Sequence, residues 1–315
     1  MSYPNTHSLL KPVQLRLIQE IAQHGQLQMA SEACGMTQPA ASRMLAGIEQ
    51  KIGARLFLRQ PKGMEPTEIG LSVLRRAQAI LREYGSMASD IREMKGGEAG
   101  SVRIGAVTGP AVDIVVSAIR EVKATSPKAE ITVDVQPSRE LLTYLAAGEM
   151  DLALARILPE FDSKDFNIRE MSGERVRFLV RAGHPMTRHD PVTLTQLLEY
   201  EWIMQTRGAP IREATLAAFA GVGIPEPTRI VNSASLLFTI AYLSNSDAVS
   251  PLSEDLARML TQPPINAGFS VLRTPHDIRV SPYYLLSLRR RVLTPLAQRL
   301  QSTIIRLSDK RPEPG

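Results

Sequence analysis

The chain of 315 residues is long enough for two or three folded units, and its 43% apolar and 22% charged residues are typical of a globular protein. The single cysteine, Cys34, excludes an internal disulfide, and no stretch reaches the roughly 18 apolar residues of a membrane span. Residues 1–14 lack the apolar core of a signal peptide, so we expect a cytoplasmic protein without a membrane partner.

The net charge of +5 is concentrated near the N-terminus. Residues 1–65 hold seven Lys and Arg against four Asp and Glu, whereas residues 66–315 hold 30 against 28. A local excess of positive charge is typical of a module that meets phosphates. The charge distribution therefore directs the search for a nucleic-acid-binding domain to the first 65 residues.

The N-terminal segment predicts three short helices. The first is expected from Pro12 to His24 and the second from Gln26 to Cys34, each with apolar residues at helical spacing. A tight turn at Gly35–Met36 leads to Thr37, a good N-cap for a third helix over Gln38–Lys51. The positions expected to face inward are Leu15, Leu17, Ile18, Ile21 and Ala22 in the first helix, and Ala40, Met44, Leu45, Ile48 and Ile52 in or after the third.

Two helices joined by a short turn, the second with an exposed polar side, are typical of a helix-turn-helix. The third helix would present Gln38, Ser42 and Arg43 near its N-terminal half. Glutamine suits adenine edges, arginine suits guanine edges or phosphates, and the helix start at Thr37 suits a phosphate oxygen. The alternative is an ordinary three-helix bundle whose last helix has a polar surface.

The segment Gly53–Thr67 predicts a wing beside the third helix. A short strand, a basic Lys62–Gly63 turn and a second extended stretch form a hairpin, which favours DNA binding over a plain bundle. Basic residues of this hairpin would lie against a flanking minor groove or the DNA backbone. The candidate DNA contacts are Thr37, Gln38, Pro39, Ser42, Arg43, Arg55, Arg59 and Lys62.

The run from Gly25 to Gly70 resembles the N-terminal domain of LysR-type transcriptional regulators. The residues that match in type and spacing are Ala30, Ala33, Gln38 to Arg43, Ile48, Glu49, Gly53, Leu56, Phe57, Arg59, Thr67 and Gly70. Two departures are Gln26–Leu27, where the family usually has Ser-Phe, and Pro66, where an aliphatic residue is common. The resemblance implies a winged helix-turn-helix domain that binds double-stranded DNA at promoters or operators.

Thr67–Met94 contains no proline and predicts one long helix of about 28 residues, roughly 40 Å in length. Its apolar stripe consists of Leu71, Leu74, Gln78, Leu81, Tyr84, Met87 or Ala88, Ile91 and Met94. The stripe either packs against its own chain or pairs with the same helix of a second copy. The resemblance favours a homodimer that assembles further into a homotetramer, and Lys95–Gly100 is expected to be a hinge.

From Ser101 the sequence alternates strands and helices, which predicts an α/β fold with a mostly parallel sheet. Strands are expected over Val102–Val107, Ile131–Val135 and Asp151–Arg156, and helices over Ala111–Thr125 and Arg139–Ala147. Ligands of such sheets lie beyond the carboxyl ends of the strands. The polar or small residues at those ends are Thr108, Gly109, Gln136, Ser138 and Arg156. The alternative is that Thr108 and Ser138 only cap the following helices.

The order of the later elements resembles the effector domain of LysR-type regulators, which is itself similar to two-lobed periplasmic solute-binding proteins. The resemblance implies that the chain exchanges lobes near Glu170 and again near Arg273. It places further effector contacts at Gln205, Thr206, Asn232, Ser233 and Ser250. The expected division is a DNA-binding domain at 1–66, a linker helix at 67–95 and an effector domain at 96–315, with lobe I at about 101–169 and 274–307 and lobe II at about 170–273.

The sequence contains no Gly-rich phosphate loop, nucleophile elbow or metal-spaced histidine pair, so we expect neither an enzyme nor a cofactor or metal site. Cys34 lies among Ala30, Ala33 and Met36, so we expect it to be a small core residue rather than a reactive thiol. A transport solute-binding protein would not need the N-terminal module. An architectural DNA binder would leave the α/β domain without a role.

The sequence therefore predicts a transcriptional regulator, controlled by a small-molecule effector, whose partners are DNA, its own copies and RNA polymerase. The whole chain is similar to regulators of galactose-binding-protein operons, which favours a sugar effector; a carboxylate stays open. The operator, and the choice between activation and repression, stay open as well.

Overall fold

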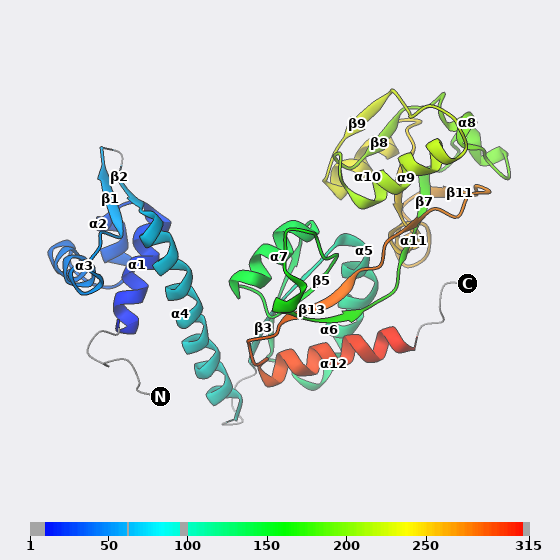
Figure 1. The fold of residues 1–315 in the computed structure, drawn as a ribbon. Coiled ribbons are helices and arrows are strands. Elements are labelled where there is room, and N and C mark those ends of the chain that lie inside the picture. The colour runs from blue at the N-terminus through cyan, green and yellow to red at the C-terminus, as the bar shows by residue number, and fades with distance from the viewer. Residues whose placement is uncertain (1–9, 62, 95–99, 311–315) are drawn as a thin grey trace. The chain divides into compact units, whose positions relative to one another are not determined.

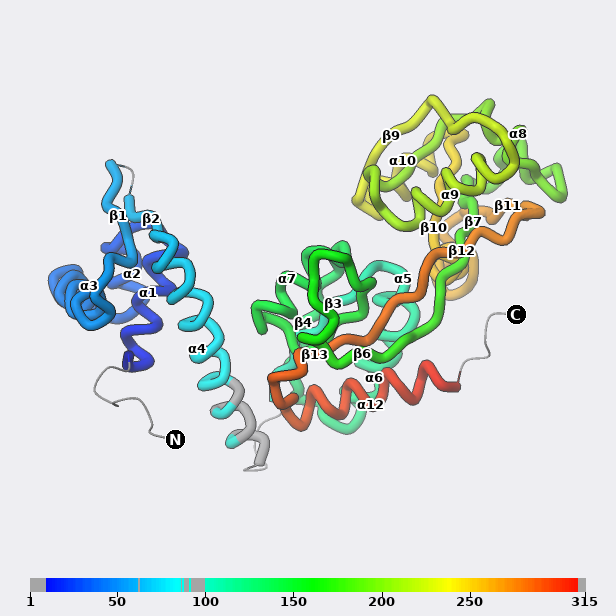
Figure 2. The backbone as a smooth tube through the Cα atoms, viewed as in Figure 1, coloured from blue at the N-terminus to red at the C-terminus, as the bar shows by residue number. Residues whose placement is uncertain are grey.

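The computed structural model describes residues 10–61, 63–94 and 100–310, and the chain divides after Gly100 into two units (Figure 1). The N-terminal unit is built from the helices α1 Pro12–His24, α2 Leu27–Ala33, α3 Gln38–Ile52 and α4 Glu68–Met94, with the hairpin strands β1 Phe57–Gln60 and β2 Gly63–Pro66 (Figure 2). The three short helices and the wing predicted from the sequence are confirmed. Helix α2 starts one residue later than predicted because Gln26 is its extended N-cap residue.

The core of the N-terminal unit collects one face of each helix. It contains Leu17, Ile18, Ile21, Ala30, Ala41, Leu45, Ile48, Leu56 and Phe57. In α3 the buried alanine is Ala41 rather than the predicted Ala40, while Leu45 and Ile48 lie inward as expected. Cys34 packs against this cluster, and burial raises the pKa of its thiol, which agrees with a core role.

Residues that carry the family resemblance fasten the wing to the helices. The Glu49 carboxylate accepts hydrogen bonds from the amides of Leu56, at 2.8 Å, and Phe57, at 3.3 Å. The Thr67 hydroxyl donates to a backbone carbonyl before the wing and accepts from the amide of Gly70 at 2.9 Å. A Cβ on Gly70 would lie 2.0 Å from the carbonyl oxygen of Leu56, so only glycine allows α4 to start this close.

The apolar side of α4 divides between two environments. Near its start, Val73 and Leu74 pack against the core of the N-terminal unit, and Ala77 is fully buried. Further along, Tyr84, Met87 and Ile91 are 45–51% exposed. Part of the stripe therefore packs against its own chain, and the part beyond it is exposed over the residues that the structure describes.

Lobe I of the second unit is a five-stranded sheet in the order β4-β3-β5-β13-β6. Its strands are β3 Ser101–Ala106, β4 Glu130–Val135, β5 Leu152–Ala155, β6 Phe166–Glu170 and β13 Tyr284–Leu288. Strand β3 pairs in parallel with β4 and β5, as expected, whereas β13 is antiparallel to β5 and β6. The antiparallel pairs arise because β6 leads out of this lobe and β13 leads back into it.

The helices of lobe I are α5 Thr108–Pro110, a π-helical turn at Ala111–Val115, α6 Val116–Thr125, α7 Ser138–Ala147 and α12 Pro295–Asp309. A 3₁₀ turn at Ser163–Asp165 precedes β6. The first helical stretch starts at Thr108 instead of the predicted Ala111. Val107 is extended and serves as its N-cap residue, and Pro110 is tolerated in the first turn. Thr108 and Gly109 therefore belong to a helix start.

Lobe II is built around β7 Glu174–Arg181. Its neighbours β10 Ser250–Ser253, β11 Phe269–Leu272 and β12 Arg279–Val280 are all antiparallel to β7, so the expectation of a mostly parallel sheet is wrong here. The strands β8 Trp202–Met204 and β9 Ile230–Asn232 form a parallel pair in this lobe, and Val249 adds a parallel bridge to Trp202. Its helices are α8 Leu194–Leu197, α9 Pro210–Gly221, α10 Leu236–Ser244 and α11 Glu254–Thr261.

Lobe II has its own aromatic core, in which Trp202 meets Phe178 and Phe219 edge-on, each with ring centroids 5.4 Å apart. The chain stays with this lobe beyond Arg273, where the sequence suggested its return. Val280 pairs with Glu174 and lies in the lobe II core, and the chain re-enters the lobe I sheet only at β13. None of the helices in the described ranges is long and apolar enough to cross a membrane.

His184 is a buried turn residue of lobe II, and the hydrogen bonds of its two ring nitrogens favour the neutral imidazole. It precedes a 3₁₀ turn at Pro185–Arg188, and its Nδ1 accepts from the amide of Met186 at 3.1 Å. Its Nε2 lies 3.1 Å from the carbonyl oxygen of Asp247, to which it donates in this tautomer. Burial lowers the pKa of His184 below its ordinary value of 6.5, and a second ring proton would also displace the Met186 bond.

Acidification is therefore expected to destabilise lobe II through His184. Below about pH 6.5 His184 is protonated in the unfolded chain but stays neutral in the folded protein. The free energy of unfolding therefore falls by up to about 1.4 kcal/mol per pH unit until the folded-state pKa is reached. His184→Asn keeps a side-chain acceptor for the turn and cannot titrate. Thermal melts from pH 8 to pH 5 should show a shallower decline for this variant, and equal slopes would contradict the assignment.

Candidate nucleic-acid interface and effector cleft

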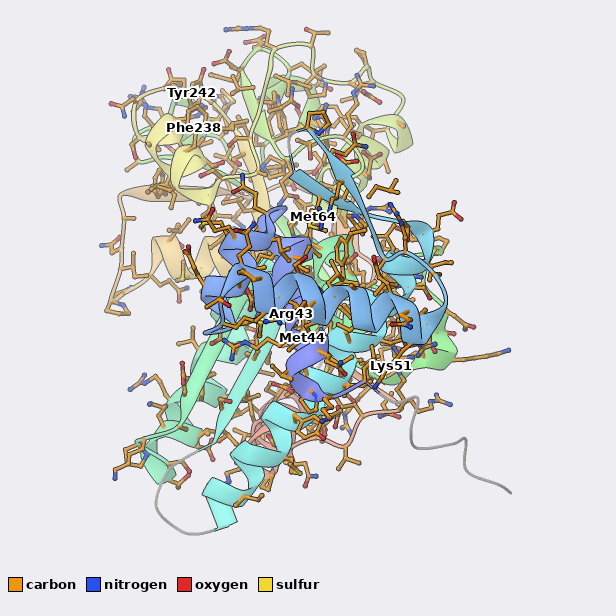
Figure 3. All side chains as sticks on the ribbon, turned by 90° about the vertical axis from the view of Figure 1, so that its left-hand side faces the viewer. Arg43, Met44, Lys51, Met64, Phe238 and Tyr242 are labelled. Carbon is orange, nitrogen blue, oxygen red and sulfur yellow. The ribbon has the colours of Figure 1, made fainter. Side chains whose placement is uncertain are left out.

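The polar side of α3 is open to solvent. Thr37 is the N-cap residue of α3, yet its hydroxyl makes no capping hydrogen bond and the residue is exposed. Gln38, Pro39 and Arg43 are exposed as well, and Ser42 is half-buried. Arg43 lies in the N-terminal half of α3, away from Lys51 in its last turn (Figure 3). The first two turns of α3 thus present hydrogen-bonding groups outward.

A hollow of about 550 Å³ lies between α3, the start of α2 and the wing. Of the predicted DNA contacts it brings together Gln38, Pro39, Ser42 and Arg59; Thr37, Arg43 and Arg55 are exposed outside its lining. The other lining residues are Gln26, Leu27, Gln28, Gln60, Gly63 and Met64. Sequence reasoning missed the glutamines among them, although the departure from the family pattern at Gln26 had marked the position.

The wing is fixed against the turn between α1 and α2. The amide of Met64 donates to the carbonyl oxygen of Gly25 at 2.6 Å. Gly63 has φ +142°, and a Cβ at this position would lie 2.3 Å from the same oxygen. Glycine is therefore required here by both conformation and space, and the contact fixes β2 at the side of the hollow.

The arginines of this surface are available to an external anion. Arg43, Arg55 and Arg59 are exposed, and none of them forms an ion pair with any residue in the described part of the chain. Lys62, the remaining basic candidate, lies outside the described residues. Exposed guanidinium groups without an internal partner suit phosphates and guanine edges.

In lobe I three of the predicted effector contacts, Gly109, Ser138 and Arg156, lie at a buried ion pair. Arg156 follows β5, its amide donates to the Ser138 hydroxyl at 3.0 Å, and its guanidinium pairs with the carboxylate of Glu174. Its Nε also donates to the carbonyl oxygen of Ser281 at 3.0 Å. The Arg156 and Glu174 side chains are only 10% and 4% exposed. Glu174 is the first residue of β7, so this pair joins the two lobes.

Glu174 also explains the glycine at the start of α5. A Cβ on Gly109 would lie 2.0 Å from a Glu174 carboxylate oxygen, so a larger residue would displace this carboxylate.

The charge of Glu174 also affects its neighbours. Burial raises the pKa of nearby Tyr283 to about 12, with the charge of Glu174 adding to the effect. Burial also raises the pKa of Asp255, again with a contribution from Glu174. Gln136 lies exposed after β4, and no hydrogen bond among the described residues ties its side chain to this group.

In lobe II the candidates follow the parallel strands β8 and β9. Gln205 and Thr206 follow β8, Asn232 ends β9, and Ser233 donates its amide to the carbonyl oxygen of Met204 at 2.9 Å. Ser250 is the first residue of β10, pairs with Leu179 and is 2% exposed. It directly follows Val249, which forms a parallel bridge with Trp202 of β8. The structure therefore groups the five lobe II candidates around β8, with Ser250 buried.

Sequence reasoning missed Arg212, which connects two of these candidates. The residue lies in the first turn of α9 and is 4% exposed. Its Nη1 donates to the backbone carbonyl of Gln205 at 3.0 Å and to the side-chain oxygen of Asn232. The helix start Pro210–Ile211–Arg212 gives no sign of this in the sequence, because the contact depends on how α9 packs beside β8 and β9.

A second, smaller hollow of about 250 Å³ lies where the helical start of lobe I meets α11 of lobe II. Its charged lining residues are Asp113, Asp255 and Arg258, and Arg258 pairs with Asp255 and lies 3.7 Å from Asp113. The two lobes are thus connected by charged side chains at two places, this one and the Arg156–Glu174 pair.

The sequence of this chain matches two family models. Residues 12–71 match the bacterial regulatory helix-turn-helix protein, lysR family, and residues 95–307 match the LysR substrate binding domain. Both families describe transcriptional regulators rather than enzymes.

Individual proteins give the same result. The HTH-type transcriptional regulator GbpR of Rhizobium radiobacter is 40% identical over 248 residues, covering 78% of this chain and 82% of that protein. GbpR of Azospirillum brasilense is 31% identical over 301 residues, covering 95% and 87%. The crystal structure of full-length CbnR complexed with its target DNA has a similar fold, with a TM-score of 0.69, 20% identity and coverage of 94% and 99%. The chain belongs to the LysR family of DNA-binding transcriptional regulators.

Proposed function

We propose that the chain binds its promoter with the first turns of α3 in a major groove and the wing along the flanking backbone. The observation that carries this proposal is the unpaired, exposed set of Arg43, Arg55 and Arg59 around the polar side of α3. Base edges specify the sequence while phosphate contacts fix the register of the protein on the duplex. Gln38 and Arg43 are the residues that read bases, and Thr37, Arg55 and Arg59 are those that hold phosphates.

Two copies pair through α4 in this proposal, so that two recognition helices address a dyad-symmetric site. The support is the exposed apolar run of Tyr84, Met87 and Ile91, which has no cover within the described part of the chain. Dimers assemble further into tetramers on DNA, and the bound assembly contacts RNA polymerase.

The second unit senses a small polar effector between its two α/β lobes. The candidate contacts from lobe II, Gln205, Thr206, Asn232 and Ser233, supply amides and hydroxyls that suit a polyhydroxylated ligand. The relatives named GbpR, and the similarity to regulators of galactose-binding-protein operons, favour a sugar-responsive transport or catabolic operon. Binding that favours one lobe arrangement changes the spacing of the DNA-binding domains, and hence transcription.

A gel-shift titration on the DNA upstream of the gene itself tests the proposal. Footprinting beside it is expected to show a protected dyad-symmetric site, and D-galactose or an acidic derivative of it is expected to change the affinity for that site. Because phosphate contacts release counterions, affinity for about six to ten contacts should fall roughly 10³- to 10⁵-fold between 50 and 200 mM salt. Absence of specific binding even at low salt would contradict DNA recognition by α3.

A further inference from the structure

Arg212 is a buried cation with no counter-charge among the residues that the structure describes. Its Nε is buried and has no hydrogen-bond partner within the described residues. Its other contacts are the neutral oxygens of Gln205 and Asn232, and no carboxylate in the described ranges forms an ion pair with it. A charge removed from water without a partner is strongly unfavourable. A buried cation of this kind can be compensated by an external anion.

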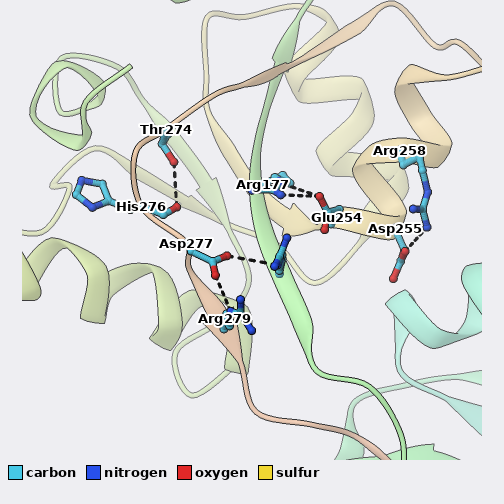
Figure 4. A network of polar contacts seen from close by, with 9 residues as sticks. Arg177, Glu254, Asp255, Arg258, Thr274, His276, Asp277 and Arg279 are labelled. Carbon is cyan, nitrogen blue, oxygen red and sulfur yellow. Dashed lines mark hydrogen bonds and ion pairs between the residues drawn. The ribbon is translucent and has the colours of Figure 1, made fainter. Parts of the chain in front are cut away.

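The other arginines of lobe II show how unusual this is. Arg177 pairs with Glu254, Arg258 with Asp255 and Arg279 with Asp277 (Figure 4). All three arginines are at least 30% exposed at the side chain, yet each has a carboxylate. Arg212, the most deeply buried arginine of the lobe, has no carboxylate among the described residues; the other arginines of the lobe that lack one, Arg188, Arg207 and Arg229, are exposed to solvent.

Buried charges elsewhere in the second unit are paired too. Arg156 and Glu174 neutralise each other, and buried Asp151 meets Arg291 at 2.9 Å. Arg156 therefore brings no uncompensated charge to the proposed effector site. Of these buried charged groups, Arg212 alone has no opposite charge within the described residues.

The position of Arg212 adds to the positive potential. It lies in the first turn of the twelve-residue helix α9, where the helix dipole is positive and a cation is disfavoured. Its guanidinium reaches Gln205 after β8 and Asn232 at the end of β9. Those are the carboxyl ends of two parallel strands, where ligands of α/β folds bind. An external anion here would be favoured by the side chain and the helix together.

We infer that Arg212 is the counter-ion for an anionic group of the effector. The ligand is then a hydroxylated anion, such as a sugar acid or sugar phosphate, rather than a neutral sugar. Its anionic group is held at Arg212 and the start of α9, and its hydroxyls are held by the amides and hydroxyls of Gln205, Thr206, Asn232 and Ser233. This inference rests on the proposed function, because it names the ligand class of the same cleft.

Isothermal titration of the full-length protein separates the ligand classes. D-galactose, D-galactonate and D-galactose 6-phosphate share most of their hydroxyl pattern and differ in the presence and kind of the anion. We expect one or both anions to bind at least tenfold more tightly than D-galactose, with the stronger of the two identifying the anion. Equal affinity for D-galactose, or no binding by either anion, overturns the inference. If D-galactose altered the footprint and neither anion did, the inference would be overturned, while effector control of DNA binding would stand.

Two variants test Arg212 itself. Arg212→Gln removes the charge and keeps a donor amide, and is expected to weaken anion binding roughly ten- to hundredfold. Arg207→Gln removes an exposed arginine from the neighbouring loop and should leave binding unchanged. Asn232→Asp places a carboxylate against Arg212, and is expected to raise the melting temperature and abolish anion binding. Wild-type anion affinity in either Arg212→Gln or Asn232→Asp overturns the assignment.

Discussion

Replacing Arg43 by alanine is expected to lower the affinity for the cognate promoter roughly five- to hundredfold while leaving the fold intact. An arginine bidentate to a guanine edge contributes about 1–3 kcal/mol of discrimination against other bases. Arg43 is exposed on α3 and takes no part in the core of the N-terminal unit, so its removal costs little folding energy. Gel shifts on cognate and unrelated DNA, with circular dichroism of the free protein, measure both effects.

Lys51→Ala is the matched control, because Lys51 is an exposed cation in the last turn of the same helix. It should change the affinity for cognate DNA far less than Arg43→Ala does. If Arg43→Ala weakened cognate and unrelated DNA equally, Arg43 would contact only phosphates. Unchanged cognate binding would remove α3 from the interface.

The N-terminal unit could be predicted from sequence because its signals are local. Pro39 in the first turn of α3 and the glycines that end α1 and α3 each act within a few residues. The contacts that fix the wing are different in kind. Met64 bonds to Gly25, which is distant in the sequence, and Glu49 bonds to Leu56. The resemblance included Glu49 and Leu56, while no signal in the sequence marked Met64.

The effector domain was less predictable because its site depends on distant segments. Arg156 was recognised as a polar strand-end residue, but its partner Glu174 comes from the other lobe. Arg212 looks like an ordinary helix residue until α9 packs beside β8 and β9. Antiparallel pairing around β7 was also missed, since strand direction depends on which strands the chain brings together.

Glu174→Gln is expected to destabilise the effector domain by about 3–5 kcal/mol, the usual cost of leaving one partner of a buried ion pair uncompensated. For a unit of this size that corresponds to a melting temperature roughly 6–20 °C lower. The Arg156 cation would lose its only carboxylate among the described residues while its Nε stayed bonded to Ser281. Differential scanning calorimetry of the full-length protein resolves the transition.

The double variant Arg156→Met with Glu174→Met separates charge from packing. Removing both charges should recover most of the loss, because the desolvation cost of a buried pair often matches its attraction. A double variant no more stable than Glu174→Gln would show that these side chains hold the lobes together by geometry rather than by charge compensation. Recovery would instead mean that Glu174 serves mainly to neutralise Arg156. Because a neutralised Arg156 attracts no anion, charge recognition in the cleft would then rest on Arg212, and the double variant should keep the anion preference of the wild type.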